Sequence, residues 1–214
     1  MTGLPTSVAG LRELLSERFP QAARTTGAVL PTGIPAIDDL VRGLPRPALT
    51  ELVGAAPSCG RQLFLGQLLQ LTRQRGGRVG LIDGADGFDP ASWAPEWLEH
   101  LVWVRCRATS EAMAVADLLA RDANLELVVL DLRRATKPEL RRIPASTWYR
   151  LQRAVEQSDL AMLVLTPSPV VPSAQLRLVL DQSHHLADQT VERRQLVQAL
   201  PAELQRQRRS AVAG

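Results

Sequence analysis

Short runs of consecutive apolar residues alternate along this chain with longer amphipathic segments. An unbroken apolar run is typical of a strand buried on both faces, whereas apolar residues three and four positions apart predict a helix. The predicted strands span residues 48–53, 78–83, 101–104, 125–131, 160–165 and 175–181, and the predicted helices span residues 34–41, 63–76, 93–98, 110–121 and 146–158. This alternation predicts an α/β fold with a mostly parallel central sheet that helices cover on both faces.

Both ends of the chain carry further amphipathic segments. Residues 8–19 have helical spacing of leucines and are ended by Pro20. In the C-terminal segment the spacing recurs, with an apolar set that Pro201 interrupts: Leu196, Val197, Leu200 and Leu204. This basic tail is expected to be helical or flexible, and it either docks on the domain or presents a helix to a partner. We expect an N-terminal helix and connector (1–29), a core domain (30–185) and the tail (186–214).

The composition is that of an ordinary globular chain and excludes several classes of protein. Of the 214 residues, 45% are hydrophobic and 22% are charged. The sequence contains no apolar run long enough to span a membrane and no N-terminal pattern of a signal peptide. Cys59 and Cys106 form neither a disulfide framework nor a zinc pattern. We therefore expect a cytoplasmic protein, in which association with the nucleoid is an open alternative.

Arginine carries nearly all the positive charge, since Lys137 is the only lysine, and the net charge is +3. A GC-rich bacterial genome explains this bias at surface positions. Arginine also suits phosphate and protein contacts because its guanidinium is a planar fork of donors. The predicted segment 132–144 is basic and loop-like, so its charges either contact phosphate or are simply solvated. The candidates for nucleic-acid or partner contact are Arg133, Arg134, Lys137, Arg141, Arg142, Arg193, Arg194, Arg206, Arg208 and Arg209.

The candidate chemistry lies between residues 50 and 65, where a strand, a glycine-bounded loop and a helix follow one another. A phosphate-binding P-loop has this order, and its motif G-x-x-x-x-G-K-[ST] uses the lysine for phosphate and the hydroxyl for Mg²⁺. Here Arg61 and Gln62 stand at those two positions, and the spacing from Gly54 to Gly60 is one residue too long. The backbone amides of such a loop could still hold an anion at the helix N-terminus.

The joint order of these segments resembles the RecA recombinase core over residues 30–185. The residues that carry the resemblance are LPTGIPAIDDLVRGLPRPALTELVG, VGLIDGADGFDP, LELVVLDL and AMLVLTPS. The narrower likeness is to short RecA-like proteins of ImuA type, carried by LRELLSERFP and the LPTG…LPRPALTELVG run. The resemblance implies a RecA-like P-loop core and a place in DNA-damage mutagenesis, beside a Y-family-like protein and an error-prone polymerase.

Most residues of the family's ATPase site are replaced at the matching positions of this sequence. In the family a glutamate that positions the attacking water follows the strand matching Leu81–Asp83, and Ala85 holds this place; the adjacent Asp86 would have to approach from another direction. The sensor residue, usually glutamine, matches Ser168. Asp131 keeps the aspartate of the Walker B strand, and it either binds a metal or caps amides at a strand end. The degenerate nucleotide site is then Gly54, Ser58, Cys59, Gly60, Arg61, Gln62 and Asp131.

These departures imply a pseudo-ATPase, without catalytic residues, a metal site or a cofactor beyond weak binding of ATP, ADP or another anion. Losing one such group typically costs orders of magnitude in turnover. The first hypothesis is a non-catalytic RecA-like accessory protein in the SOS response and translesion synthesis. It would act through contacts with a polymerase module or with RecA. The alternatives are a P-loop protein that binds ATP weakly and hydrolyses it slowly or not at all, and a DNA-binding RecA paralogue.

Overall fold

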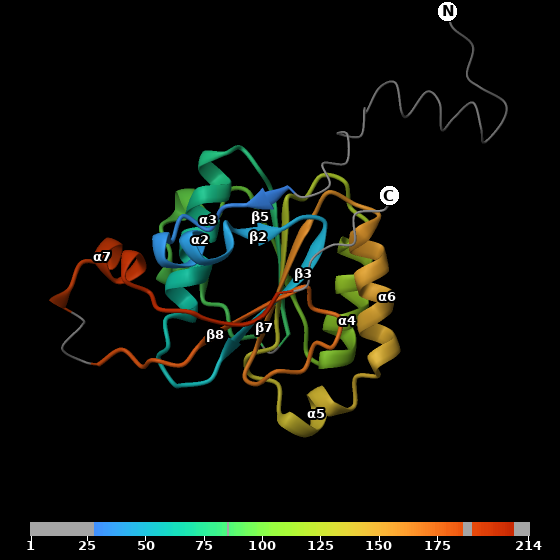
Figure 1. Ribbon diagram of the computed structural model, residues 1–214. Helices are drawn as coiled ribbons and strands as arrows, with labels where there is room; N and C mark the ends of the chain where they lie inside the picture. Colours follow the sequence, from blue (N-terminus) through green and yellow to red (C-terminus); the bar gives the residue numbers. More distant parts are fainter. Residues whose placement is uncertain (1–27, 85, 186–189, 208–214) are drawn as a thin grey trace, which may run out of the picture.

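One mixed sheet forms the centre of the fold, as the computed structural model in Figure 1 shows; it describes residues 28–84, 86–185 and 190–207. The strand order is β5-β4-β6-β7-β3-β8-β9. All neighbouring pairs are parallel except β8 and β9, which are antiparallel. The strands are β3 (Ala48–Gly54), β4 (Val79–Asp83), β5 (Leu101–Arg105), β6 (Leu127–Asp131), β7 (Ala161–Thr166), β8 (Leu176–Leu180) and β9 (Glu203–Gln207). The predicted α/β class is confirmed.

Helices cover both faces of this sheet (Figure 1). One face packs against α2 (Pro35–Val41), α3 (Arg61–Gln74) and α7 (Arg193–Gln198), and the other against α4 (Thr109–Leu119) and α6 (Ala145–Glu156). Two apolar cores result, one on each side of the strands, because successive strand residues point to opposite faces. A small antiparallel pair, β1 (Val29–Leu30) with β2 (Leu44–Pro45), lies before β3.

The prediction that residues 132–144 form a loop is wrong, because helix α5 (Lys137–Arg141) lies within it. Its N-terminus is closed by a capping box: Glu139 N–H donates to Thr136 Oγ1, and Thr136 N–H donates to the Glu139 carboxylate. Pro138 in the first turn also favours a helix start. The brief helix expected near Trp93 and Trp97 is two short 3₁₀ turns, η1 (Pro90–Ser92) and η2 (Pro95–Trp97).

The C-terminal tail also differs from the expected helix. Among its described residues α7 is the helical part, and after Pro201 the chain forms β9 and pairs antiparallel with β8, with Leu204 opposite Leu178. Pro201 cannot continue the helical hydrogen bonds, and alternation of exposed and half-buried residues then suits an edge strand. The helix expected at residues 8–19 lies outside the described residues, as do Arg208 and Arg209. In the part of the chain that the structure describes, no helix is long and apolar enough to cross a membrane.

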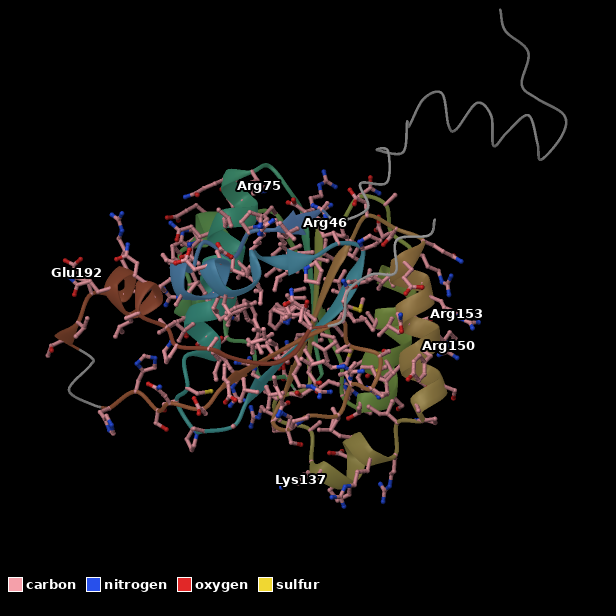
Figure 2. All side chains as sticks on the ribbon, in the orientation of Figure 1. Arg46, Arg75, Lys137, Arg150, Arg153 and Glu192 are labelled. Carbon is pink, nitrogen blue, oxygen red and sulfur yellow. The ribbon has the colours of Figure 1, made fainter. Side chains whose placement is uncertain are left out.

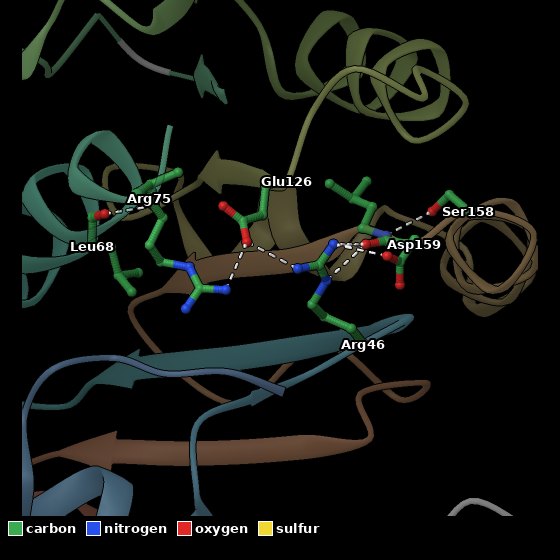
Figure 3. Close-up of polar contacts among 8 residues, drawn as sticks. Arg46, Leu68, Arg75, Glu126, Ser158 and Asp159 are labelled. Atoms are coloured by element: carbon green, nitrogen blue, oxygen red, sulfur yellow. Dashed lines mark hydrogen bonds and ion pairs between the residues drawn. The ribbon is translucent and has the colours of Figure 1, made fainter. Parts of the chain in front are cut away.

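The amino ends of the strands are tied by ion pairs, which Figure 3 shows in close-up. Arg46, just before β3, donates from Nη1 to Glu126 Oε1 at 3.0 Å and from Nε to the carbonyl of Asp159 at 2.7 Å. Arg75 shares the same Glu126 oxygen at 3.5 Å. This edge of the sheet is therefore occupied by structural contacts, and the candidate site lies at the opposite edge.

Candidate functional site

The carboxyl ends of the parallel strands meet at one edge of the sheet, where ligands bind in open α/β folds. Asp83 at the end of β4 lies in register beside Asp131 at the end of β6, and Asp131 lies beside Leu165 of β7. Val53 of β3 lies beside Thr166. The expectation that these strand ends share an edge is confirmed.

The β3–α3 loop, residues 55–60, follows directly from the carboxyl end of β3 at Gly54. Gly60 is the N-cap of α3 with φ +84°, and Ser58 has φ +50°. Cys59 between them is buried, 2% exposed. The predicted order of strand, glycine-bounded loop and helix is confirmed, and phosphate binding by this loop stays a prediction.

Arg61 occupies the root of this loop. A Cβ added to Gly54 would lie 2.4 Å from Arg61 Cδ and 2.5 Å from its Cζ, so the arginine side chain rests directly on the end of β3. Its Nη1 is buried and makes no hydrogen bond within the described part of the chain. A lysine ammonium is a compact point charge, whereas this broad guanidinium fills the space beside Gly54.

The segment after β8 covers the other end of the loop. His184 N–H donates to the carbonyl of Ser58 at 3.0 Å, and Ser183 Oγ donates to that of Pro57 at 2.8 Å. A Cβ on Gly60 would lie 2.3 Å from Leu200 Cδ1 and 3.1 Å from His184 Nε2. Leu200 is fully buried. We call residues 183–184 and 193–200 the C-terminal latch.

Arg193 anchors the latch on an aromatic cluster. Its guanidinium lies 5.4 Å from the ring centroid of Trp93 and 5.6 Å from that of Trp97, both within the range of cation–π attraction. The Trp93 ring is stacked on Phe88 with centroids 5.7 Å apart. Arg193 Nη2 also donates to the carbonyl of Gln62 at 3.4 Å. Arg193, a predicted partner contact, thus makes intramolecular contacts here, although both it and its neighbour Arg194 are exposed.

Asp131 is held by an arginine two residues further along the chain. Arg133 Nε lies 2.8 Å from both carboxylate oxygens, its Nη2 donates to Oδ2, and its N–H donates to Oδ1 at 3.0 Å. The two side chains are 12% and 5% exposed. This geometry matches the strand-end interpretation of Asp131. Among the described residues, no cluster of three or more His, Cys, Asp or Glu could hold a metal ion.

The acidic residues after β4 shape the next loop. Ala85 lies outside the described residues. Asp83 is buried and accepts hydrogen bonds from the N–H groups of Gly87 and Phe88 at 2.8 and 2.9 Å. Asp86 forms a bidentate pair with Arg105, at 2.7 and 2.6 Å, and these hydrogen bonds hold the pKa of its carboxyl below the ordinary value. Asp86 is therefore engaged by Arg105 on the surface.

A buried carboxylate fixes the loop after β7. Glu51 Oε1 accepts hydrogen bonds from the N–H groups of Val170 and Val171 at 2.7 and 3.2 Å, and Arg177 Nε donates to its Oε2 at 2.6 Å. Glu51 is fully buried. Ser168 within this loop lines a cavity of about 490 Å³, together with Lys137 and Arg141 of α5. The loop is thereby held against the sheet end.

The other predicted basic residues spread over a separate part of the surface. Arg134, Lys137, Arg141 and Arg142 are exposed on and around α5. Figure 2 places Lys137 on α5 and Arg150 and Arg153 on α6. Glu192 lies beside α7, at the opposite side of the molecule from α6 in this view. Arg206 lies on β9 opposite Arg177. Their contacts with nucleic acid or partners stay predictions.

Comparison with known proteins gives one informative match. Over 118 residues, or 53% of this chain, the sequence is 31% identical to Protein RecA of Clavibacter michiganensis subsp. michiganensis (strain NCPPB 382). The matched part covers 32% of that protein, about a third of its length. No family model matches the chain. The match and the sheet support a RecA-like relationship within the α/β class; the likeness to the ImuA type stays a prediction.

Proposed function

We propose that this chain is a RecA-like accessory protein of the DNA-damage response that does not turn over ATP. It works in the cytoplasm, in SOS-linked mutagenesis and translesion synthesis, through contacts with a polymerase module or with RecA. One observation carries the proposal: the chain's own side chains occupy both ends of the β3–α3 loop, with Arg61 over Gly54 and with Leu200 and His184 over Gly60.

The physical argument concerns what a bound triphosphate requires. Its phosphates need free N–H groups at the helix N-terminus, a cation at the end of the loop and a hydroxyl for Mg²⁺. At Gly60 the approach is filled by an apolar side chain, which offers no hydrogen bond to a phosphate. Asp131, which would orient Mg²⁺, already has both oxygens engaged by Arg133. Turnover would require both contacts to open at once.

Calorimetric titration with ATP, with ADP and with either plus Mg²⁺ tests this proposal, alongside phosphate release in the presence of single-stranded DNA. We expect no heat of binding at millimolar nucleotide and no phosphate release above that of a heat-inactivated sample. Release at the rate of an authentic recombinase would overturn the proposal. The proposed partner contacts are tested by capture of a purified polymerase module or of RecA on the immobilised protein. Capture of neither would count against these contacts.

A second candidate, weak nucleotide binding without turnover, is favoured by Arg61 Nη1. This donor is buried without an acceptor among the described residues, and an anion would supply one. The matched comparison is Arg61→Ala against Arg194→Ala, which removes an exposed arginine of α7. Saturable heat with ADP that disappears only in Arg61→Ala would favour the second candidate over the first.

A further inference from the structure

Two contiguous cavities lie beside α4, on the half of the carboxyl edge that the latch does not reach. The first, of about 710 Å³, is lined by Arg105, Arg107 and Arg134. The second, of about 430 Å³, lies between α4 and the start of α6. They share Ala108, Thr109 and Glu139, so they form one groove. We call this the arginine groove.

The groove has more positive charge than its own carboxylates neutralise. Asp86 is paired with Arg105, which also stacks over Trp103 at 5.2 Å. The Glu139 carboxylate accepts from Thr136 N–H and Oγ1, both at 2.7 Å. Arg107, Arg134 and Arg142 take part in none of the ion pairs formed among the described residues. The backbone N–H of Arg107 donates to Glu111 at 2.7 Å. The pKa of Asp86 is lowered by its hydrogen bonds with Arg105 and, to a smaller extent, by the charge of Arg134. The pKa of Glu139 is lowered by its hydrogen bonds with Thr136 and, to a smaller extent, by the charge of Arg142. These guanidinium groups are available to an anionic partner.

The second cavity adds an apolar floor, made by Met113, Ala114, Ile143 and Pro144. Arg142 and Arg150 also line it, and Arg150 Nε lies 3.4 Å from Asp117 Oδ1. A nucleic-acid backbone has no group to fill an apolar floor, whereas a peptide can place a leucine there and carboxylates on the arginines. Arginine pairs with carboxylates in a bidentate manner, which adds geometric specificity.

We propose that the arginine groove is the docking site for an acidic peptide segment of a protein partner. An apolar side chain of the peptide packs on Met113 and Ile143, and its flanking carboxylates pair with Arg107, Arg134 and Arg142. This inference rests on the proposed function, since it identifies the surface through which the accessory role is exercised. It does not depend on the state of the β3–α3 loop.

The test uses a fluorescein-labelled synthetic peptide of aspartates and glutamates around two leucines, titrated with the full chain and followed by anisotropy. We expect saturable binding that Arg107→Glu and Arg134→Glu each weaken roughly tenfold, the loss of about one charge-assisted hydrogen bond. Arg194→Glu makes the same charge change on α7 and should leave the affinity unchanged. Circular dichroism confirms that each variant is folded.

A peptide with serines in place of the leucines should bind at least roughly tenfold more weakly, because the apolar floor then has no occupant. The proposal is overturned by three results: no binding of the leucine peptide, equal losses in Arg194→Glu and Arg107→Glu, or displacement of the peptide by a labelled oligothymidine that binds more tightly. If the peptide does not bind, the outcome of the nucleotide titrations is unaffected. If the protein turns over ATP but still binds the peptide, only the proposed function is overturned.

Discussion

At the carboxyl edge of the sheet, the loop after β3 is covered by the chain's own residues, whereas the groove beside α4 is open. Both regions sit at the ends of parallel strands and both begin a helix, at Gly60 and at Ala108. The difference lies in what runs past them. After β8 the chain carries Val197 and Leu200, which must be buried somewhere, and they pack on α3. After β6 the capping box at Thr136 starts helix α5 within a few residues of the strand, and α5 lies beyond the end of the sheet (Figure 1).

This comparison shows that one edge of a sheet can be covered by packing at one end and left open at the other. Covering the β3–α3 loop needs only a few apolar residues in a following segment, because an apolar side chain excludes water and phosphate alike. The groove stays open because its lining is charged, and burying unpaired guanidinium groups is costly. The loop is thus packed by the chain itself, and the groove is where we propose that an external partner binds.

The largest expected effect of breaking this arrangement is at Leu200. Because it is fully buried against Gly60, Leu200→Ala should lower the free energy of unfolding by about 2 to 5 kcal/mol. The matched control is Leu118→Ala on α4, where the side chain is 69% exposed and the cost should stay below about 0.5 kcal/mol. Urea unfolding followed by circular dichroism measures both. Equal effects would mean that the latch contributes nothing to the packing of the loop.

A smaller effect is expected from filling the contact between the loop and the latch. Gly60 and Gly76 both have positive φ, +84° and +72°, but only Gly60 faces other side chains within 4 Å. Gly76→Ala should therefore cost about 1 kcal/mol for its backbone alone. Gly60→Ala should cost about 1 to 3 kcal/mol more, because the added methyl group displaces Leu200. Unfolding midpoints in urea separate the two, and equal midpoints would argue against close packing at Gly60.

The anchor of the latch should matter less again. Arg193→Ala removes the guanidinium from above Trp93 and Trp97 and should cost about 1 kcal/mol, with faster amide hydrogen exchange in α7. Arg194→Ala, next to it and exposed, should change neither quantity. If exchange in α7 rose equally in both variants, the cation–π contact would not be the anchor.

The sequence was informative wherever a local period determined the structure. The apolar runs predicted β3, β6 and β7, and alternation with helices predicted their shared edge. Two further features were also readable and were missed. Thr136 and Glu139 have the spacing of a capping box, which predicts a helix start rather than a loop. Arg133 follows Asp131 by two residues, the spacing at which an aspartate side chain accepts the backbone N–H of a turn.

The latch could not be found in this way. Leu200 and Gly60 lie far apart in the chain, and their contact depends on the path after β8 and on the turn at Pro201. Helical spacing suggested one amphipathic segment, but tertiary pairing of β9 with β8 overrode that local preference. Likewise the arginine groove combines residues of β5, α4 and α5, which only the topology brings together.

The smallest expected effect is a difference between the groove and the covered β3–α3 loop in their response to a fall in pH. Arg105 hydrogen bonds hold the pKa of Asp86 below its unfolded value, so their contribution to stability is fully present above the unfolded pKa and is lost as pH falls through the folded pKa. The exposed pair contributes little stability, so the measurement is the Asp86 carboxyl titration by NMR. Its midpoint should return toward the ordinary range in Arg105→Gln, while the contact between Leu200 and Gly60, being apolar, should keep the same exchange protection across this pH range. A midpoint unmoved in Arg105→Gln would mean that Arg105 is free for an external carboxylate, and would add it to Arg107, Arg134 and Arg142 as a contact for the peptide.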